Sequence, residues 1–411
     1  MKKKIYIINK ISRAAAYGIG TYTSQLTACL KKSSIEFEII HLFSEGSEVT
    51  VEEKDGYRQI LIPAIELVKH KSLQYYSRNV VCLLREFIPS NSGYELIFHL
   101  NFMNYEHLVK ELKKAFRCKV ILTVHYTNWS FDLFGNYKIL LKTLNAKKKD
   151  LSDFEKRIVN SFMEDVRMIN RCDRLICVAR HSLDSFTENS NINRKKCFVI
   201  NNGLRDEYKK YSEEKKMLIR RKYFISKSAR IILFAGRLEP VKGLVYLIKS
   251  YKQVLQKHPD SLLIVAGEGH NFNTLFKDAE TCWTKIIFTG KLEKKQLYEF
   301  YQIADVGVVP SIHEEFGYVA IEMMMHQLPV VVTDTGGLAE IIEDNISGLK
   351  IPVRTRKGNR IVDVNLLTDK ICYLLEHRKE SEILGINARK RFLEKYELSV
   401  FGRKILNVYN G

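Results

Sequence analysis

Short apolar runs rich in β-branched residues alternate with longer amphipathic segments along nearly the whole chain. The first pattern is typical of buried strands and the second of surface helices, and their regular alternation indicates strand–helix units on parallel sheets. The sequence therefore predicts an α/β fold of doubly wound parallel sheets with helices on both faces. The predicted strands are residues 5–8, 37–42, 96–99, 120–124, 175–178 and 198–200, then 231–235, 262–266, 286–289, 306–309 and 330–333.

The alternation stops once, in a charged stretch at residues 205–230 that we interpret as a linker with a solvated helix. A chain of 411 residues also exceeds what one hydrophobic core usually supports. We therefore expect two domains that face a cleft, residues 1–205 and 206–390, and a C-terminal helix at 391–411 that packs back toward the first domain. Other predicted helices include residues 21–30, 106–116 and 153–170.

No apolar stretch approaches the ~20 residues that a membrane-spanning helix needs. Polar and basic residues interrupt the apolar run at the start of the chain, so no signal peptide is predicted. The eight cysteines are scattered without paired spacing, which favours reduced core residues over zinc ligands or disulfides. We expect a cytoplasmic protein that is at most attached to the inner face of a membrane.

The formal net charge of +19 narrows the partners to anionic ones, and the surplus leans toward residues 1–205. Two dense runs carry it: Lys110, Lys113, Lys114, Arg117 and Lys119, then Lys138, Lys142, Lys147, Lys148 and Lys149. We interpret them as solvated helix faces, with contact to an anionic membrane or an acidic acceptor as the alternative. Nucleic acid is not expected, because the runs lack interleaved stacking aromatics.

The most informative segment follows the predicted strand at 306–309, and ligands of parallel sheets bind where strands end. Glu314 lies in the loop, Gly317 suits a tight turn into a helix, and Glu322 lies on that helix. Two carboxylates placed this way can accept hydroxyl donors from a ribose or a hexose. Ordinary acidic residues on a helix surface would show the same spacing.

This segment resembles the E-x-F-G-x4-E fingerprint of the retaining family 4 glycosyltransferases, filled here by Glu314, Phe316, Gly317 and Glu322. The resemblance implies the GT-B fold, with two Rossmann-like domains, and transfer of a hexose-type sugar from a UDP- or GDP-linked donor with retention of configuration. It also implies that Glu314 orients the donor sugar and that Glu322 binds the ribose. Phe316 and Gly317 are expected beside the nucleotide sugar.

A second segment, residues 236–243, follows the strand at 231–235 and resembles the G-R-x4-K-G motif of the same family. The resemblance places Arg237 and Lys242 on the donor diphosphate. A planar guanidinium and a compact ammonium can each neutralise a leaving diphosphate. An unrelated pair of surface cations is the alternative.

Two further elements follow later strands of the second half. Gly336 and Gly337 precede a helix, and glycine there lets backbone N–H groups approach an anion that the helix dipole favours. A plain turn would use the same residues. The segment 288–292 resembles the family's base pocket, in which main-chain groups of Lys291 and Leu292 would contact the base.

In the first half, residues 17–22 resemble the family's glycine-rich first loop, and Gly20 is expected against the donor phosphate or the acceptor. His125 ends the strand at 120–124, where family members place a histidine that faces the donor sugar. Tyr126 and Trp129 form either an acceptor platform or ordinary aromatic core packing.

The sequence thus predicts a glycosyltransferase, with a glycan or lipid-linked saccharide of polysaccharide biosynthesis as the leading acceptor. A peptide or small-molecule acceptor is the alternative, as is a non-catalytic nucleotide-sugar-binding protein. Acceptor specificity is expected in loops around 57–91 and 131–149. No D-x-D pair is present to hold a diphosphate through a divalent cation, so no metal or other cofactor is expected.

Overall fold

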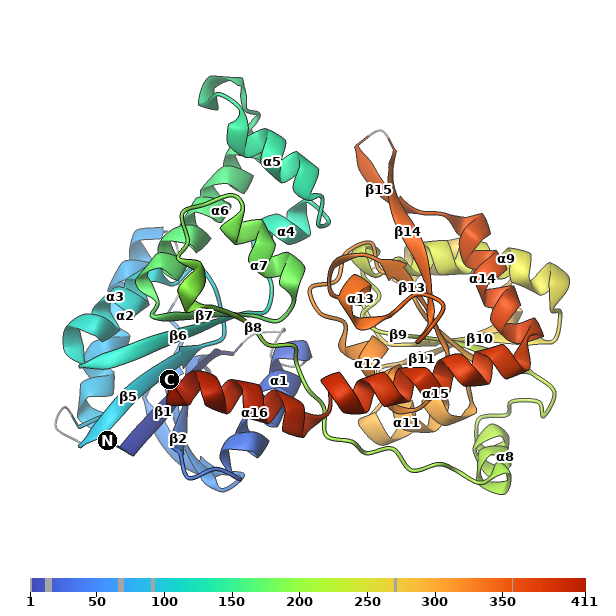
Figure 1. The fold of residues 1–411 in the computed structure, drawn as a ribbon, viewed down its shortest axis with the longest axis horizontal. Helices are drawn as coiled ribbons and strands as arrows, with labels where there is room; N and C mark the ends of the chain where they lie inside the picture. Colours follow the sequence, from blue (N-terminus) through green and yellow to red (C-terminus); the bar gives the residue numbers. More distant parts are fainter. Residues whose placement is uncertain (1, 12–16, 66–69, 90–92, 270–271, 357) are drawn as a thin grey trace. The chain divides into compact units, whose positions relative to one another are not determined.

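The computed structural model describes residues 2–11, 17–65, 70–89, 93–269, 272–356 and 358–411. The chain divides into two compact units, one formed by Met1–Gly203 with Leu398–Gly411 and the other by Leu204–Glu397. We call them unit 1 and unit 2 and describe each by itself. Each contains a mostly parallel sheet with helices on both faces, which confirms the predicted α/β class (Figure 1).

Unit 1 holds an eight-stranded sheet in the order β3-β4-β2-β1-β5-β6-β7-β8. Neighbouring strands run parallel except β3 and β4, which pair antiparallel. The strands are β1 (Lys2–Lys10), β2 (Glu36–Ser44), β3 (Thr50–Lys54), β4 (Tyr57–Pro63), β5 (Tyr94–Leu100), β6 (Cys118–Val124), β7 (Arg174–Cys177) and β8 (Cys197–Val199).

The central strands of unit 1 are apolar on both faces because helices cover both faces. Along β1, Ile5 and Ile7 belong to a buried cluster with side chains of α1 and α16. Tyr6 and Ile8 point to the other face and belong to the cluster that includes α2, α3 and α6. The helices are α1 (Gly18–Leu30), α2 (His70–Phe87), α3 (Glu106–Ala115), α4 (Asn128–Asp132), α5 (Tyr137–Asn145), η2 (Lys148–Asp150), α6 (Asp153–Arg171), α7 (Arg180–Thr187), η3 (Arg194–Lys196) and α16 (Leu398–Asn410).

Helix α16, from the end of the chain, packs in unit 1 beside α1 (Figure 1). Gly402 allows this approach, since a Cβ there would lie 2.9 Å from Sγ of Cys29. Lys3 Nζ donates to the carbonyl oxygens of Tyr409 and Asn410 at 2.9 and 2.8 Å. These carbonyls end the helix and have no partner within it, so the first strand caps the last helix.

Unit 2 holds a seven-stranded sheet in the order β11-β10-β9-β12-β13-β14-β15. All neighbours run parallel except β14 and β15, which form an antiparallel pair at one edge. The strands are β9 (Arg230–Ala235), β10 (Ser261–Ala266), β11 (Ile286–Gly290), β12 (Val306–Val309), β13 (Val330–Asp334), β14 (Leu349–Arg356) and β15 (Asn359–Val362).

The core of unit 2 lies between the central strands and helices on the sheet. Ile232 and Phe234 of β9 pack in one buried cluster with Leu247 and Ile248 of α9. The helices are α8 (Glu213–Lys222), η4 (Pro240–Lys242), α9 (Leu244–Lys257), α10 (Phe272–Ala279), η5 (Trp283–Lys285), α11 (Lys294–Ile303), α12 (Tyr318–Met325), α13 (Gly336–Ile341), α14 (Val364–Glu376) and α15 (Arg378–Lys395). Within the described part of the chain, no helix combines the length and the apolar character that crossing a bilayer requires.

Each predicted strand overlaps an observed one, and all eight cysteines carry free thiols. The structure corrects the expectation of loops around 57–91 and 131–149, because these segments contain β4, α2 and α5. Buried Ile60 and Ile62 fix β4, and α2 buries Tyr76, Val80 and Leu84 at the spacing of one helix face. The expectation of loops came from the family resemblance, and the apolar periodicity of these segments is that of a strand and a helix.

Candidate functional site

The loops that follow the strands of unit 2 pack closely against one another, and glycines make this possible. Gly267 has a φ of +148°, and a Cβ there would lie 1.8 Å from the carbonyl oxygen of Gly236. Gly243 has a φ of +70°, and a Cβ there would lie 1.9 Å from the carbonyl oxygen of Pro310. Only glycine satisfies both the backbone angle and the contact, so the loops after β9, β10 and β12 form one continuous edge.

Lys242 and Glu314 meet at this carboxyl edge of the sheet. The Nζ atom of Lys242 lies 2.6 Å from Oε2 of Glu314, and Ser311 Oγ donates to the same oxygen at 3.2 Å. The two charged side chains are only 19% and 16% exposed, so water screens their attraction less than on an open surface. The structure therefore brings together two predicted site residues from the loops after β9 and β12.

Arg237 opens the loop that Lys242 closes. Its Nη1 donates to Oε1 of Glu239 at 2.8 Å, and both side chains are about a quarter exposed. The sequence analysis did not pair these residues, although Glu239 stands only two positions further along the chain. Arg237 and Lys242, the two residues predicted to bind the diphosphate, therefore each have a carboxylate partner within unit 2.

The backbone around Glu314 is pressed against the start of α13. Gly337 donates its N–H to the carbonyl oxygen of Glu314 at 2.8 Å. A Cβ at Gly336 would lie 1.9 Å from that oxygen, and one at Gly337 would lie 2.2 Å from the carbonyl oxygen of Phe316. The two glycines thus fix the position of Glu314. The Gly337 amide, which we expected to approach an anion, donates within the protein.

Phe316 and Gly317 shape the turn between Glu314 and α12. Phe316 is buried and meets the rings of Tyr318 and Tyr396 edge-on. Gly317 has a φ of +117°, and a Cβ there would lie 2.8 Å from a methyl group of Leu338. Their contribution in this structure is packing and backbone geometry.

Glu322 lies on α12 and is partly buried. Its Oε2 accepts a hydrogen bond from Tyr301 Oη of α11 at 2.8 Å. Burial raises the pKa of Glu322 to about 7, while the Tyr301 hydroxyl favours the ionised carboxylate. The carboxyl group is therefore divided between its two protonation states near neutral pH. The sequence analysis missed Tyr301, because no spacing rule links two helices packed in the fold.

Lys291 and Leu292 follow β11 and lie at the same edge of the sheet. The side chain of Lys291 is exposed and that of Leu292 is partly buried. The carbonyl oxygen of Gly290 accepts the N–H of Gly267 at 2.9 Å. This bond joins the loop after β11 to the loop after β10, so the predicted base-contacting segment belongs to the edge that carries Lys242 and Glu314.

A cavity of about 650 Å³ lies at the other end of the unit 2 sheet. Its lining includes Arg230, Asp305 and Pro329, which stand at the amino ends of β9, β12 and β13. Arg220 also lines it, with its guanidinium bonded to the carbonyl oxygens of Ser226 and Ala229. No predicted site residue lines this cavity, so we place the candidate site at the carboxyl edge.

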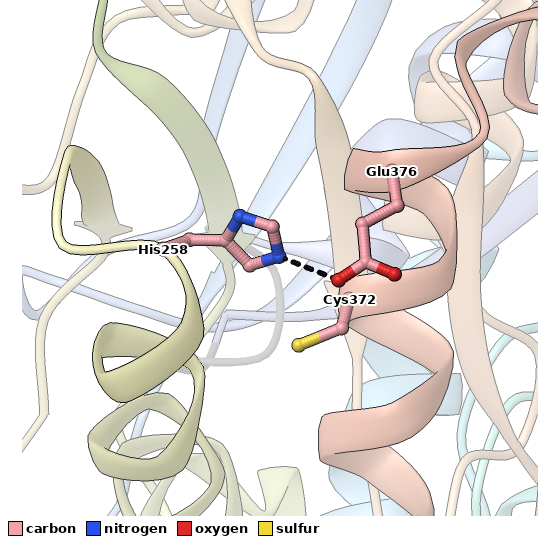
Figure 2. Close-up of side chains that lie close together, drawn as sticks. All are labelled: His258, Cys372 and Glu376. Carbon is pink, nitrogen blue, oxygen red and sulfur yellow. Dashed lines mark hydrogen bonds and ion pairs between the residues drawn. The ribbon is translucent and has the colours of Figure 1, made fainter.

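Figure 2 shows the group of three potential metal ligands that the described residues contain, His258, Cys372 and Glu376. His258 follows α9, and the other two lie one turn apart on α14. His258 Nε2 is 3.0 Å from Glu376 Oε1, and burial raises the pKa of the Cys372 thiol. The group lies on α14 and directly after the end of α9, and not on the loops after the strands, so it is separate from the candidate site.

In unit 1, the two predicted residues lie on neighbouring elements. His125 directly follows β6, and its ring meets the ring of Tyr22 edge-on at 4.4 Å. Its Nε2 lies 3.2 Å from Oδ1 of Asn101, the residue after β5, which the sequence analysis missed. Burial lowers the pKa of His125 to about 3, so its ring is neutral at physiological pH. Gly20 lies in the first turn of α1.

A second buried histidine lies beside this group. His99 of β5 is 2.6 Å from Thr123 Oγ1 through Nε2 and 2.5 Å from Tyr409 Oη through Nδ1. Burial lowers the pKa of His99 to about 3 as well. A neutral ring that bridges β6 and α16 therefore anchors the last helix to the sheet.

Trp129 is part of the core and not an exposed platform. Its side chain is 1% exposed, its Nε1 donates to Asp165 Oδ2 at 3.0 Å, and its ring packs edge-on against Phe162 and Phe186. Of the two interpretations of Trp129, the structure supports core packing. Tyr126 remains partly exposed at the end of β6.

Comparison with known families assigns the chain. Residues 16–208 match the family model described as Glycosyltransferase Family 4, and residues 215–391 match the one described as Glycosyl transferases group 1. Together the two matches span most of both units. The chain therefore belongs to the family 4 type of glycosyltransferases, as its motifs predicted.

Curated relatives share parts of this sequence. An uncharacterized glycosyltransferase of Methanocaldococcus jannaschii is 30% identical over 258 residues, which cover 60% of this chain and 62% of the relative. Lipopolysaccharide 1,2-N-acetylglucosaminetransferase of Salmonella typhimurium is 26% identical over 211 residues, 48% of this chain and 55% of the relative. The similarity thus spans about half to three-fifths of the length of these relatives.

Solved structures show the same fold over the full chain. Sucrose-phosphate synthase from Thermosynechococcus elongatus matches with a TM-score of 0.78 at 19% identity, covering 100% of this chain and 98% of the other. HepE from Anabaena, in complex with UDP and glucose, matches with a TM-score of 0.71 at 17% identity, covering 100% of each. At these identities the likeness establishes the GT-B fold that the sequence predicted.

Proposed function

We propose that this chain is a retaining glycosyltransferase that moves a hexose-type sugar from a UDP- or GDP-linked donor to an acceptor, with the donor bound by unit 2. The observation that carries this proposal is the shielded contact between Lys242 and Glu314 at the carboxyl edge of the sheet. Separate loops supply a cation and a carboxylate at the place where parallel sheets bind ligands. Membership in the glycosyltransferase family supports the reaction class.

Arg237 and Lys242 would bind the diphosphate by exchanging partners. Their present partners, Glu239 and Glu314, each carry one negative charge, whereas a diphosphate offers more charge and more acceptor oxygens. Diphosphate binding would therefore release Glu314, whose carboxylate could then accept hydroxyl donors of the transferred sugar. The two cations would stabilise the charge that develops on the leaving diphosphate.

Glu322 would bind the ribose hydroxyls in its ionised form. Tyr301 occupies one oxygen of the carboxylate and holds it in place, and the remaining lone pairs can accept two hydroxyl donors. The main chain at Lys291 and Leu292 would contact the base. Gly336 and Gly337 would contribute by fixing the Glu314 backbone beside the diphosphate.

In unit 1, His125 would contact the donor sugar and Gly20 the donor phosphate or the acceptor. A neutral imidazole is suited to hydrogen bonding with sugar hydroxyls, and burial keeps His125 neutral. A departing phosphate oxygen would take the acceptor proton, because the unit 2 carboxylates already have other roles.

The acceptor is proposed to be a glycan or a lipid-linked saccharide. The similarity to a lipopolysaccharide N-acetylglucosaminetransferase supports this class. A peptide or small-molecule acceptor is the second candidate, and the similarity to the alpha-D-kanosaminyltransferase of Streptomyces kanamyceticus, 27% identical over 182 residues, favours it. A non-catalytic nucleotide-sugar-binding protein is the third, and only turnover separates it from the enzymes.

The direct test is nucleotide release from a panel of UDP- and GDP-sugars, with and without acceptor mixtures. We expect slow release from at least one donor, loss of release in Lys242→Ala, and full activity in Lys249→Ala, which removes an exposed cation of α9. A metal-independent reaction is also proposed, so EDTA should leave release unchanged. Donor binding without any release would indicate a binding protein.

We also propose a peripheral contact of unit 1 with anionic membranes through α5 and the residues after it. Three lysines of the first basic run, Lys113, Lys114 and Lys119, are paired with carboxylates. Among the described residues, Lys138 and Lys142 of α5 have no such ion pair, and Leu141 between them is 43% exposed. Basic residues beside an exposed apolar side chain favour anionic lipid surfaces.

Vesicle sedimentation tests this contact. Vesicles with anionic lipid should bind the protein, and replacing Lys138 and Lys142 by Glu should weaken binding. Neutral vesicles and Lys249→Glu serve as controls, and equal binding to neutral and anionic vesicles would refute the proposal.

A further inference from the structure

We propose that Asn101 and Asn9 are positioning residues for His125: a chain of hydrogen bonds through them fixes the tautomer of the imidazole and ties it to the first turn of α1. This inference rests on the proposed function, in which His125 contacts the donor sugar. It names two residues that neither the sequence motifs nor the family comparison assigns to the site.

The chain of bonds runs in one direction from ring to helix. His125 Nε2 is 3.2 Å from Asn101 Oδ1, and Asn101 Nδ2 donates to Asn9 Oδ1 at 3.0 Å. Asn9 Nδ2 then donates to Thr23 Oγ1 at 3.2 Å, and the Thr23 hydroxyl donates to the carbonyl oxygen of Ile19 at 3.0 Å. Each donating atom along the chain meets one acceptor, so the directions of the bonds are mutually consistent.

This order of donors decides the tautomer of His125. The amide nitrogen of Asn101 is directed at Asn9, so its oxygen faces the imidazole and requires an N–H donor there. A neutral imidazole has one N–H, which is then on Nε2 and leaves Nδ1 as an acceptor. The ring therefore presents a lone pair, suited to a hydroxyl donor of a sugar.

The groups around His125 are neutral. Tyr22 of α1 packs against the ring, with its hydroxyl 3.3 Å from Thr123 Oγ1. His99 of β5 lies nearby, and burial lowers its pKa to about 3 and raises that of Tyr22. Among the residues that the structure describes, burial is what shifts the pKa of His125, so the direction of the Asn101 amide decides the tautomer, while Tyr22 packs against the ring.

Burial of the two side-chain amides destabilises the folded protein unless both are hydrogen-bonded. Asn101 is 1% exposed and Asn9 is 5% exposed, at the carboxyl ends of the neighbouring strands β5 and β1. An unpaired buried amide destabilises a protein by about 1–3 kcal/mol, so each amide is held to its present orientation. An apolar pair of similar shape would fill this space without the penalty, which argues that the polar chain serves more than packing.

The chain also connects the two predicted residues of unit 1. Thr23 ties the Asn9 amide to the carbonyl oxygen of Ile19, which immediately precedes Gly20 in the first turn of α1. The position of that turn and the orientation of His125 are therefore set by the same four bonds. A change at Asn101 should therefore alter both the orientation of His125 and the position of the first turn of α1.

Histidine-selective ¹⁵N NMR on the full chain tests this directly, because the two ring nitrogens report tautomer and pKa. The 11 histidines give a small set of signals, and His125→Gln assigns the one that matters. Wild-type His125 should show a single Nε2–H tautomer. Asn101→Ala should populate both tautomers, and Asn101→Asp should raise the pKa of His125 by about 1 to 3 units because a carboxylate favours imidazolium.

Turnover is measured on the same variants. Asn101→Ala should lower kcat by about 10- to 100-fold, because a misplaced contact group loses that much rate, with a smaller change in KM for the donor. Asn189→Ala, which removes a single bond to the Ser185 carbonyl, is the control and should leave kcat unchanged. Thr23→Val is a milder variant that cuts the far end of the chain, and it should give a partial tautomer shift.

The outcomes separate this inference from the proposed function. An unchanged tautomer and pKa of His125 in both Asn101 variants would overturn the positioning role. The same result in Thr23→Val, should the Asn101 variants not fold, would also overturn it. A shifted tautomer with unchanged turnover would confirm the hydrogen-bond chain. It would also show that His125 has no role in the proposed reaction.

Discussion

The carboxyl edges of the two sheets are built from different chemistry. In unit 2, charged side chains from separate loops meet as ion pairs, Lys242 with Glu314 and Arg237 with Glu239. In unit 1, the corresponding edge holds His125 and a chain of buried amides and hydroxyls without an ionised member. An ion pair can exchange its anion for a diphosphate, whereas a neutral network can only orient what it touches. We therefore propose that unit 2 supplies charge stabilisation and that unit 1 supplies orientation.

Removing the shielded cation should give the largest effect. Lys242→Ala leaves Glu314 with the Ser311 hydrogen bond but without its cation, and it removes the positive charge proposed to stabilise the leaving diphosphate, so we expect kcat to fall by about 10²- to 10³-fold. Steady-state kinetics with the best donor measures this, with Lys249→Ala as the matched control. A loss below threefold would contradict the assignment of charge stabilisation to this edge.

The packing of the unit 2 loops should be the next most sensitive feature. Gly267→Ala places a Cβ against the Gly236 carbonyl at a φ that side chains rarely adopt, and we expect a loss of about 3 kcal/mol in stability. Gly290→Ala is the matched control, because its φ is +70° but nothing lies within 4 Å of the added Cβ. Calorimetry should show a clearly smaller loss for Gly290→Ala, and equal losses would refute the close-packing argument.

The neutral network of unit 1 should make the stability of the protein fall at acid pH. The pKa of His99 is about 3 in the folded protein and about 6.5 when unfolded, so the unfolded chain binds the proton first as pH falls. Neutral His99 therefore contributes its full share to the free energy of unfolding above pH 6.5. This contribution falls as the pH drops below 6.5, and about 2 kcal/mol of it is lost at pH 5. His99→Gln should flatten the loss of stability between pH 7 and 5, and exposed His377→Gln should not. Equal slopes in His99→Gln and wild type would contradict a buried neutral ring.

The smallest expected effect concerns Glu322 in unit 2. Tyr301→Phe removes a hydrogen bond to the ionised carboxylate, which should raise the pKa of Glu322 by about 0.7 units if that bond contributes about 1 kcal/mol. Lys294 favours the ionised form and Glu207 opposes it, and neither changes in this variant. The rise of donor KM at low pH should therefore begin at higher pH, and an unshifted profile would refute the role of Tyr301.

Much of the fold could be predicted because buried strands such as β1 and β12 are apolar on both faces and therefore appear in the sequence as continuous apolar runs. The sequence analysis did not predict the antiparallel pairs β3–β4 and β14–β15, because their outer strands β3 and β15 lie at sheet edges and carry polar residues typical of loops. The expectation of acceptor loops around 57–91 came from the family resemblance, whereas the buried residues Ile60 and Ile62 of β4 and Leu84 of α2 follow the spacing of a strand and a helix.

The candidate site could be predicted only where a motif is local. Lys242, Glu314 and Glu322 lie in short fingerprints, and the first two are in contact. Tertiary packing brings in Tyr301, the partner of Glu322, and joins Asn9 to Asn101. These residues are far apart in the sequence, and no local pattern marks them. Local spacing identifies which groups take part, whereas their orientation depends on the fold.

The most direct test of the account is calorimetric titration of UDP, GDP, ADP and dTDP into the wild-type chain and Lys242→Ala. We predict that one of these nucleotides binds the wild type with a Kd below about 1 mM and binds Lys242→Ala at least tenfold more weakly, a difference of about 1.4 kcal/mol. Binding of equal strength to both proteins, or to neither, would contradict a donor site at the carboxyl edge of unit 2.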